Sequence, residues 1–193
     1  SGFDITVARY VAQYLGFADK QVVFAKVIPS TRVSALTSGD VDMVVDSFAT
    51  NTDHDDEVTF AGPYLTVRRD LLIRADDKDG ILSVDDLDGK TVCTAKGSIS
   101  GSDMRNLTDK MTVEERDTYP QCVTALMIGE ADAIISDDVI LTGLAADRGG
   151  GYLKVVGEPF GEQSYGIAVR NGKSELVGQI DAALKAMVAD GSW

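Results

Sequence analysis

The chain has 193 residues, of which 44% are hydrophobic and 25% charged, and its formal net charge is −13. This composition is typical of a globular protein with one large or two small domains, and no apolar run approaches the roughly 18 residues of a membrane-spanning helix. The acidic excess disfavours binding to nucleic acid or to an anionic membrane surface, because both would repel the chain.

The pattern of apolar residues predicts helices and strands that alternate along most of the chain. Helices are expected where apolar residues recur every three to four positions, and strands where they alternate or form a short run. In chain order we expect a helix over 3–15, a strand over 21–27, a helix over 31–37, strands over 43–48, 70–74 and 91–95, a turn and helix over 97–107, a helix over 121–128, a strand over 131–135, and helices over 139–146 and 175–189. This order indicates an α/β protein with mainly parallel sheets.

One pattern occurs twice: a helix, the motif Gly-x-x-Asp, an apolar strand and then polar residues. The first copy covers residues 36–47 and the second covers residues 126–137. Each copy would end a strand with polar residues at its carboxyl edge, which is where open α/β sheets place their ligands. The repeat therefore predicts two lobes that face each other across a ligand cleft.

Acidic residues cluster in three short segments, 53–57, 76–79 and 85–88. Solvated loops explain such runs more simply than a metal site does. Their spacing lacks the central glycine and distal glutamate of a calcium loop. With a single histidine and no pair of cysteines two residues apart, a zinc site is disfavoured as well, and we expect no metal or other cofactor.

The chain opens with Gly2, Phe3, Asp4 and Ile5, followed by an amphipathic helical pattern. This opening resembles the signature of the polar-amino-acid family of solute-binding proteins, the extracytoplasmic receptors of ABC importers. Thr6 departs from the second acidic residue that is usual there. Further segments that resemble the family follow in order, so that the resemblance covers essentially the whole chain and is strongest to the glutamate/aspartate-binding branch: residues 38–45, 58–65, 129–138, 165–170 and 187–193.

The resemblance implies a two-lobed type II periplasmic-binding-protein fold, with a mainly parallel sheet flanked by helices in each lobe. Lobe one is expected to comprise residues 1–66 and 172–193, and lobe two residues 67–171. Relatives carry a strand before the signature and a tail after the closing segment, so we expect a chain that is trimmed at both termini. The family also implies a monomer outside the cytoplasm, lipid-anchored at the cell surface or free in the periplasm, whose partners are the membrane subunits of an ABC importer.

The two cysteines, Cys93 and Cys122, are expected to form a disulfide. An even number of cysteines suggests a disulfide in a secreted protein, and similar pairs of cysteines occur in relatives within the solute-binding family. The alternative is two buried free thiols. A bridge that closes a loop of about 30 residues would stabilise the fold by roughly 3–4 kcal/mol.

An amino-acid ligand needs a carboxylate for its ammonium group and an arginine or backbone N–H groups for its carboxylate. The resemblance assigns Asp137 to the ammonium; the alternative is a helix N-cap, with Asp138 as a second cap candidate. It assigns the loop containing Lys96, Ser98 and Ile99 to the α-carboxylate, with Ile99 where relatives have serine or threonine. The alternative for this loop is an ordinary helix N-terminus.

Four further positions resemble the family's site. Arg32 matches the arginine that reaches a side-chain carboxylate in the glutamate/aspartate branch, the alternative being a surface arginine paired with an acid. Ser47 and Ala49 fall where relatives contact the ligand through backbone and hydroxyl groups. His54 replaces the arginine that clamps the α-carboxylate with two hydrogen bonds, and histidine offers at most one charged contact.

The first hypothesis is therefore a binding protein that captures an amino acid, most simply glutamate or aspartate, in the cleft between its lobes and delivers it to an ABC importer. The second is a sensor or interaction domain of the same fold whose site is depleted at Thr6, His54 and Ile99. The third is an enzyme, since dehydratases have arisen on this fold. We disfavour it because the one histidine lies in an acidic run and no Gly-x-Ser-x-Gly motif occurs.

Overall fold

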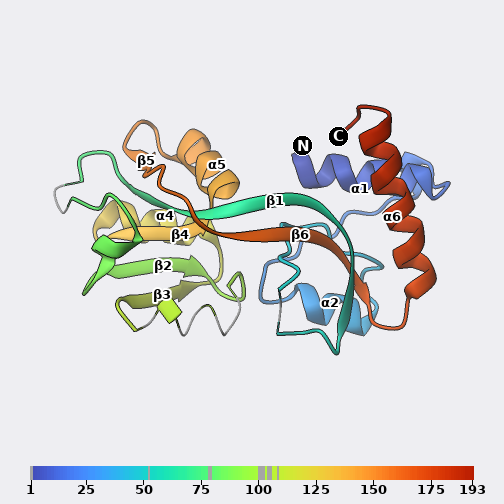
Figure 1. The fold of residues 1–193 in the computed structure, drawn as a ribbon, viewed down its shortest axis with the longest axis horizontal. Helices are drawn as coiled ribbons and strands as arrows, with labels where there is room; N and C mark the ends of the chain where they lie inside the picture. The colour runs from blue at the N-terminus through green and yellow to red at the C-terminus, as the bar shows by residue number, and fades with distance from the viewer. Residues whose placement is uncertain (1, 52, 78–79, 100–102, 104–105, 108) are drawn as a thin grey trace. The chain divides into compact units, whose positions relative to one another are not determined.

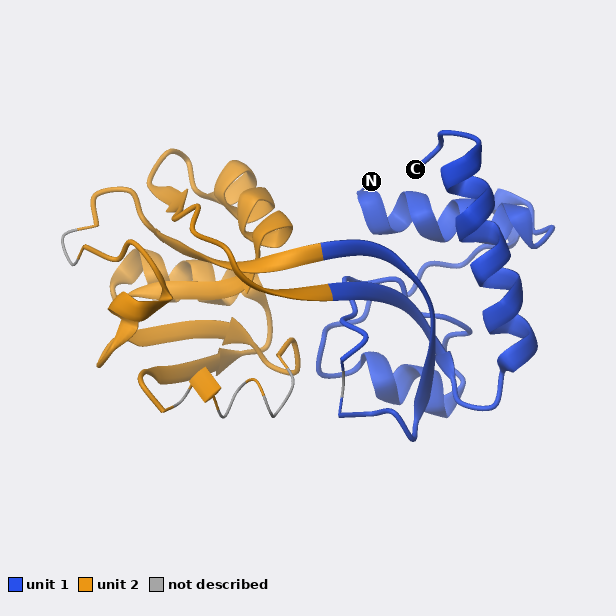
Figure 2. Ribbon diagram, viewed as in Figure 1, with its two compact units in different colours: residues 1–66, 164–193 blue, residues 67–163 orange. Residues whose placement is uncertain are grey.

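The structure is a computed structural model that describes residues 2–51, 53–77, 80–99, 103, 106–107 and 109–193. It contains two compact units, which Figure 2 colours separately: unit 1 (residues 1–66 and 164–193) and unit 2 (residues 67–163). Two long strands that pair with each other, β1 (Val58–Arg74) and β6 (Phe160–Arg170), each run from one unit into the other. The family resemblance implies a lobe boundary between residues 171 and 172; the two compact units divide between residues 163 and 164, inside β6.

Figure 1 labels the helices and strands. The helices are α1 (Phe3–Tyr14), η1 (Asp19–Gln21), α2 (Arg32–Ser38), η2 (Val84–Leu87), α4 (Tyr119–Ile128), α5 (Asp138–Arg148) and α6 (Ser174–Ala189). Besides β1 and β6, the strands are β2 (Thr91–Ala95), β3 (Thr112–Arg116), β4 (Ala133–Asp137) and β5 (Leu153–Val155). No helix within the described ranges combines the length and apolarity needed to cross a membrane.

Unit 2 is built on a mixed sheet with the strand order β3-β2-β4-β1-β5. Strand β2 runs parallel to both β3 and β4, while β1 runs antiparallel to β4 and to β5. The α/β class expected from the sequence is confirmed. The sheet is mixed because β1 enters unit 2 from unit 1 and runs against β4, an arrangement that strand-and-helix alternation does not reveal.

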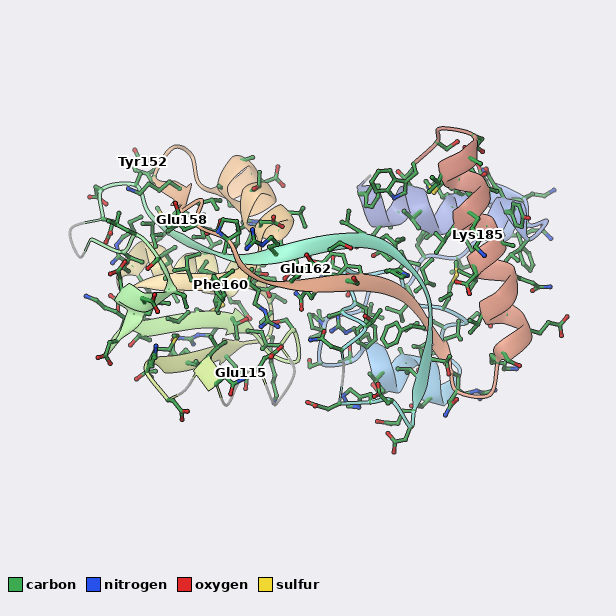
Figure 3. The ribbon with its side chains drawn as sticks, in the orientation of Figure 1. Glu115, Tyr152, Glu158, Phe160, Glu162 and Lys185 are labelled. Atoms are coloured by element: carbon green, nitrogen blue, oxygen red, sulfur yellow. A yellow bond between two sulfur atoms is a disulfide. The ribbon has the colours of Figure 1, made fainter. Side chains whose placement is uncertain are left out.

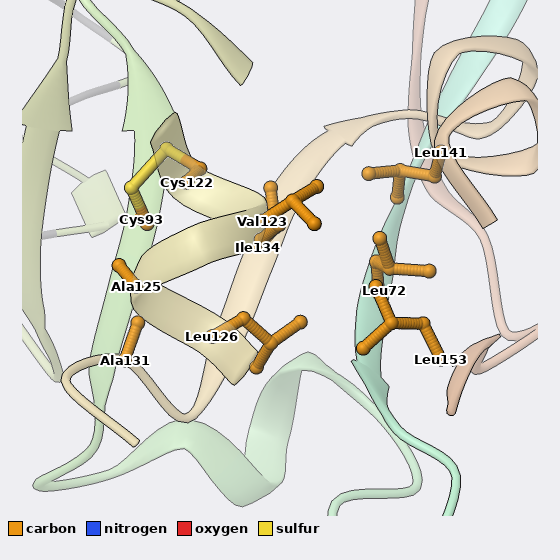
Figure 4. Packing of buried hydrophobic residues seen from close by; sticks show 10 residues of the cluster. All are labelled: Leu72, Cys93, Cys122, Val123, Ala125, Leu126, Ala131, Ile134, Leu141 and Leu153. Atoms are coloured by element: carbon orange, nitrogen blue, oxygen red, sulfur yellow. A yellow bond between two sulfur atoms is a disulfide. The ribbon is translucent and has the colours of Figure 1, made fainter. Parts of the chain in front are cut away.

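Apolar side chains fill both faces of this sheet. Successive residues of a strand point to opposite faces, so that Leu71 and Ile135 lie on one side while Leu72 and Ile134 lie on the other. This explains why β1 and β4 read as continuous apolar runs. Figure 4 shows the first cluster, which is formed by Leu72, Cys93, Cys122, Val123, Ala125, Leu126, Ala131, Ile134, Leu141 and Leu153.

A disulfide joins β2 to α4 inside this cluster. It links Cys93 to Cys122, whose Cα atoms are 5.5 Å apart and which lie 29 positions apart in the chain. Both residues are fully buried. The predicted bridge is thereby confirmed, and the two cysteines leave no free thiol in the sequence.

Unit 1 packs α1 against α6 and has a smaller apolar core of Leu36, Val44, Phe48, Val58 and Ala168. Phe48 also meets Phe60 edge to face, with ring centroids 4.9 Å apart.

Two expected strands are absent from unit 1. Residues 22–27 form no regular element and are mostly exposed, so a sheet there would bury little apolar surface. Residues 43–48 make a single bridge, between Val44 and Ala168, and the neighbouring Ala49 bridges Tyr165. Ser47 has a φ of 46°, in the left-handed region, which is incompatible with an extended strand.

The remaining differences concern elements without a strong apolar pattern. No strand was expected at β3, β5 or β6, and of β1 only the end, residues 70–74, was expected to be a strand. The helix expected over 97–107 falls largely outside the described residues. The expected helices at the two ends of the chain agree with α1 and α6 to within a residue.

Candidate functional site

Asp137 ends the buried strand β4 and stands directly before α5. Every residue of β4 is buried, and the side chain of Asp137 is only 6% exposed. Asp137 occupies the N-cap position of α5, but its side chain accepts no capping hydrogen bond from the helix. Asp138, the first residue of α5, accepts a hydrogen bond from the N–H of the next residue, Val139, at 2.8 Å. The alternative that the Asp137 side chain serves as a helix cap therefore loses its structural basis.

The carboxylate of Asp137 belongs to a chain of polar groups in unit 2. Nε2 of Gln163, from β6, donates a hydrogen bond to Oδ1 of Asp137. Oε1 of Gln163 accepts one from Nη2 of Arg69, at 3.3 Å. The same Nη2 lies 2.7 Å from Oδ2 of Asp103. The sequence analysis did not select Gln163, Arg69 or Asp103, although the charged residues 68–70, placed directly before a buried apolar run, were a signal.

The loop after β2 closes on itself through Ser98. Ser98 donates to the carbonyl oxygen of Ala95 from its N–H at 3.0 Å and from its hydroxyl at 2.6 Å. Lys96 is exposed, and its N–H continues the pairing with β3. Ile99 packs against the apolar cluster on the other face of the sheet, which includes Leu71, Val92 and Ile135. The side chains of Lys96 and Ile99 thus lie in different surroundings, one in solvent and one against the core.

Four hydroxyl groups gather at the carboxyl ends of β2 and β4. Oγ1 of Thr94 lies 3.1 Å from Oγ of Ser98. Burial raises the pKa of Tyr119, the first residue of α4, while the neighbouring hydroxyls of Ser136, Ser98 and Thr94 act against that rise. Tyr119 and Thr94 were missed: Thr94 lies within an apolar strand, and Tyr119 reaches this place only because α4 packs against β2. With Asp137 beside them, these groups offer a carboxylate and several hydrogen-bonding hydroxyls to a polar ligand.

In unit 1, Arg32 lies in the core rather than on the surface. It is 5% exposed, and its guanidinium carbon is 3.6 Å from the centre of the Phe48 ring, a cation–π contact. Its Nη1 donates to the backbone oxygen of Asp46, at 3.3 Å. The alternative of a surface arginine paired with an acid does not match this burial.

The carboxyl group of Asp46 is the most perturbed acid near Arg32. Desolvation by burial raises its pKa to about 6. The positive charge of Arg32 acts in the opposite direction, and the negative charge of Asp4 adds to the rise. Unit 1 therefore holds a carboxyl group that titrates close to neutral pH.

Ser47 is bound to Asp4, the acidic residue of the opening motif. The N–H and hydroxyl of Ser47 donate to Oδ2 of Asp4, at 2.9 and 3.0 Å. The hydroxyl of Tyr64 donates to Oδ1, at 2.9 Å, and burial together with the charge of Asp4 raises the pKa of Tyr64. The opening acid thus fixes the left-handed turn at Ser47. Ala49, two residues on, is buried and bridges Tyr165.

His54 lies in an exposed turn. Its Nδ1 is 2.7 Å from Oε1 of Glu57, and the two side chains are 46% and 44% exposed. Its carbonyl oxygen accepts hydrogen bonds from the N–H groups of Glu57 and Val58. Among the residues that the structure describes, no group of three or more histidine, cysteine or acidic side chains could hold a metal ion.

Comparison with known proteins agrees with this architecture. The model of the bacterial extracellular solute-binding proteins, family 3, matches residues 1–193. The glutamate-binding protein GluB of Corynebacterium efficiens is 35% identical over 202 residues, which cover 100% of this chain and 68% of that protein. The ABC transporter glutamine-binding protein GlnH of Bacillus subtilis is 35% identical over 193 residues, covering 100% and 69%.

Solved structures show the same fold. An ancestral arginine-binding protein bound to glutamine superposes with a TM-score of 0.89 at 30% identity, covering 98% of this chain and 83% of that one. An ancestral amino acid-binding protein described as a precursor of cyclohexadienyl dehydratase gives a TM-score of 0.85 at 26% identity, covering 99% and 80%. These matches confirm the resemblance, the type II periplasmic-binding-protein fold and the prediction of a binding protein rather than an enzyme.

Proposed function

The chain belongs to the bacterial extracellular solute-binding proteins of family 3, and from this premise we propose that it binds an amino acid outside the cytoplasm and delivers it to an ABC importer. We propose glutamate or aspartate as the ligand. The observation that carries the proposal is the carboxylate of Asp137, which is buried at the end of β4 and is not used as a helix cap.

Asp137 is suited to an ammonium group. A buried carboxylate is stabilised by a cation that reaches it with hydrogen bonds, and an α-ammonium group supplies three N–H donors. The hydroxyls of Ser98 and Tyr119 lie at the same edge of the sheet and can accept or donate further hydrogen bonds. The N–H of Ile99, in the loop after β2, is our candidate for the ligand's α-carboxylate, because the N–H of Ser98 already donates to the Ala95 carbonyl oxygen.

Arg32 is the residue that we assign to an acidic side chain of the ligand. Its contact with Phe48 and its hydrogen bond to the Asp46 carbonyl oxygen fix the position of the guanidinium, whose permanent positive charge and planar fork of donors suit a carboxylate. A glutamate-binding relative at 35% identity supports an acidic ligand. A glutamine-binding relative at the same identity makes glutamine the ligand to compare with glutamate.

A second candidate function is a sensor or interaction domain with a depleted site. Three observations favour it: His54 pairs with Glu57 in an exposed turn, the Ile99 side chain packs against the core, and Ala49 offers no hydroxyl. Such a domain would keep the fold and lose tight binding of free amino acids.

Titration with each of the twenty amino acids decides between the two functions. Calorimetry would give the affinity, and the melting temperature would report binding independently. A ligand at 100 times its dissociation constant stabilises the folded state by about 2.7 kcal/mol. Binding of only glutamate or aspartate supports the proposal. Preferential binding of glutamine or arginine would show that the ligand is a different amino acid. If no amino acid gives a heat of binding or raises the melting temperature, the depleted domain is favoured.

A further inference from the structure

Gln163 is a buried polar residue on the part of β6 that belongs to unit 2. Its side chain is 8% exposed, so it gains little from water and needs partners within the protein. It has two, one at each end of its amide: the Asp137 carboxylate and the Arg69 guanidinium. A buried amide held between two charged groups has a defined orientation.

Chemistry allows one orientation of this amide. An arginine only donates hydrogen bonds and an ionised carboxylate only accepts them, whereas an amide carries both functions. The amide oxygen must therefore face Arg69, and the NH₂ group must face Asp137. The flipped amide would set a donor against a donor and an acceptor against an acceptor. Gln163 thus presents a fixed N–H group to Oδ1 of Asp137.

The strand register explains why Arg69 is close enough to hold the amide. Arg69 and Asp137 are directly opposed in the antiparallel pairing of β1 with β4, and opposed residues place their side chains on the same face. The 2.7 Å contact between Nη2 of Arg69 and Asp103 anchors the guanidinium. Its charge is matched by Asp103, while Gln163 connects it to Asp137 through a neutral group.

We propose that Gln163 is a positioning residue for ligand binding: its amide, oriented by Arg69, holds the Asp137 carboxylate in the rotamer that receives the ligand's ammonium group. This inference rests on the proposed function, in which Asp137 binds that ammonium. An ionised carboxylate has about four lone-pair sites, so one that accepts this amide hydrogen bond can still accept hydrogen bonds from a cation. The arrangement acts on the affinity for the ammonium group and does not contact the ligand itself.

The contact is tested first without ligand. In the ¹⁵N–¹H spectrum of the whole protein, the side-chain NH₂ resonances of Gln163, assigned by their loss in Gln163→Ala, should move in Asp137→Ala. They should stay in place in Asp138→Ala, which removes a carboxylate one residue away. Unmoved resonances in Asp137→Ala would overturn the inference, whether or not the protein binds an amino acid.

Binding is tested next with glutamate and aspartate by calorimetry. Gln163→Ala is expected to weaken binding ten- to a hundredfold, and adding it to Asp137→Ala should cause no further loss, because Gln163 acts through Asp137. Glu162→Gln is the matched control: this exposed residue, labelled in Figure 3, precedes Gln163 on β6, and its substitution should leave the affinity unchanged. Equal affinity of Gln163→Ala and the unmodified protein would overturn the inference while leaving the proposed function intact.

Gln163→Glu separates positioning from packing, since it keeps the shape and exchanges the NH₂ donor for an acceptor. The introduced carboxyl group faces the Asp137 and Asp103 carboxylates, the Arg69 guanidinium and, beyond Asp137, the Tyr119 hydroxyl. Binding should be weak at pH 8 and should recover several-fold toward pH 5.5, where a protonated carboxyl can donate again. If folded Gln163→Glu does not recover binding at low pH, the positioning role of Gln163 is contradicted.

If Gln163→Ala fails to fold, Arg69→Gln replaces it in the binding measurements, because this substitution removes the guanidinium that orients the Gln163 amide.

Discussion

In unit 2 the buried carboxylate of Asp137 accepts a hydrogen bond from the Gln163 amide, whereas in unit 1 burial raises the pKa of the Asp46 carboxyl to about 6. Asp137 ends a regular strand whose neighbours bring side-chain donors to it. Asp46 lies on an irregular segment, and the nearby Arg32 guanidinium donates to its backbone oxygen. The two acids thus differ in surroundings: Asp137 accepts a hydrogen bond from a side chain of a paired strand, whereas desolvation dominates the shift in the pKa of Asp46.

The two units differ in their frameworks as well. Unit 2 has a continuous sheet, apolar clusters on both faces and a disulfide between β2 and α4. The corresponding segment of unit 1, residues 43–48, makes one backbone bridge, and its turn is fixed by the side chain of Asp4. We expect Asp137 in unit 2 to bind the ligand's ammonium group, and Asp46 in unit 1 to make the stability of the protein depend on pH.

The largest expected effect is on the ammonium site. Asp137→Ala should weaken amino-acid binding by roughly 3–5 kcal/mol, more than a hundredfold, because the ligand's ammonium would be buried without a carboxylate partner. Calorimetry measures the loss. Asp138→Ala is the control, since Asp138 accepts from the first turn of α5 and should affect folding stability instead. Unchanged affinity in Asp137→Ala would remove Asp137 from the site.

The disulfide should account for the next largest effect. Replacing both Cys93 and Cys122 by alanine removes a cross-link of 29 positions and should lower the unfolding free energy of unit 2 by about 3–4 kcal/mol. Denaturant unfolding followed by hydrogen exchange would assign the loss to β2 and α4 rather than to α1 and α6. A uniform loss in both units would show that the two frameworks unfold together.

Asp46 should make stability fall as the pH rises. Its folded pKa of about 6 lies above the ordinary value of 3.8, so between these values the folded state binds more protons than the unfolded state, and the unfolding free energy decreases with pH. Above pH 6 the full effect is about 2–3 kcal/mol. Asp46→Asn should stabilise the protein by that order at pH 7.5 and have little effect near pH 4.

Thermal or urea unfolding from pH 4 to pH 8 measures this slope. Asp42→Asn, at an exposed position nearby, removes one carboxylate without removing a buried one and serves as the control. An unchanged slope in Asp46→Asn would mean that the decrease in stability between pH 4 and pH 6 comes from other groups.

The smallest expected effect concerns His54. Its contact with Glu57 is about half exposed on both sides, and exposed pairs contribute roughly 0–1 kcal/mol to stability. If His54 replaces the family's arginine, His54→Arg should tighten binding of glutamate or aspartate by up to about tenfold, or 1.4 kcal/mol. Glu57→Gln, which releases the imidazole without adding a charge, is the control. Equal affinity in all three proteins would place His54 outside the site.

Several parts of the fold and site could be read from the sequence. The apolar periodicity located α1, α4, α5 and α6, and the continuous apolar runs located β2 and β4. The position of Asp137, directly after such a run, marked it as a residue at the carboxyl edge of a sheet. These features depend on residues that are neighbours in the chain, so the local sequence pattern is enough to predict them.

The partners of Asp137 depended on the tertiary structure. Gln163 reaches Asp137, and Arg69 reaches Gln163, only because the register of β1 against β4 and the pairing of β6 with β1 bring these strands together. Asp103 contacts Arg69 from a segment that belongs to no strand. The same holds for Ser47, where a side chain 43 positions away holds a left-handed turn in a segment that reads as a strand. Side-chain chemistry and periodicity are local properties of the sequence, whereas hydrogen-bond partners and burial are set by long-range pairing.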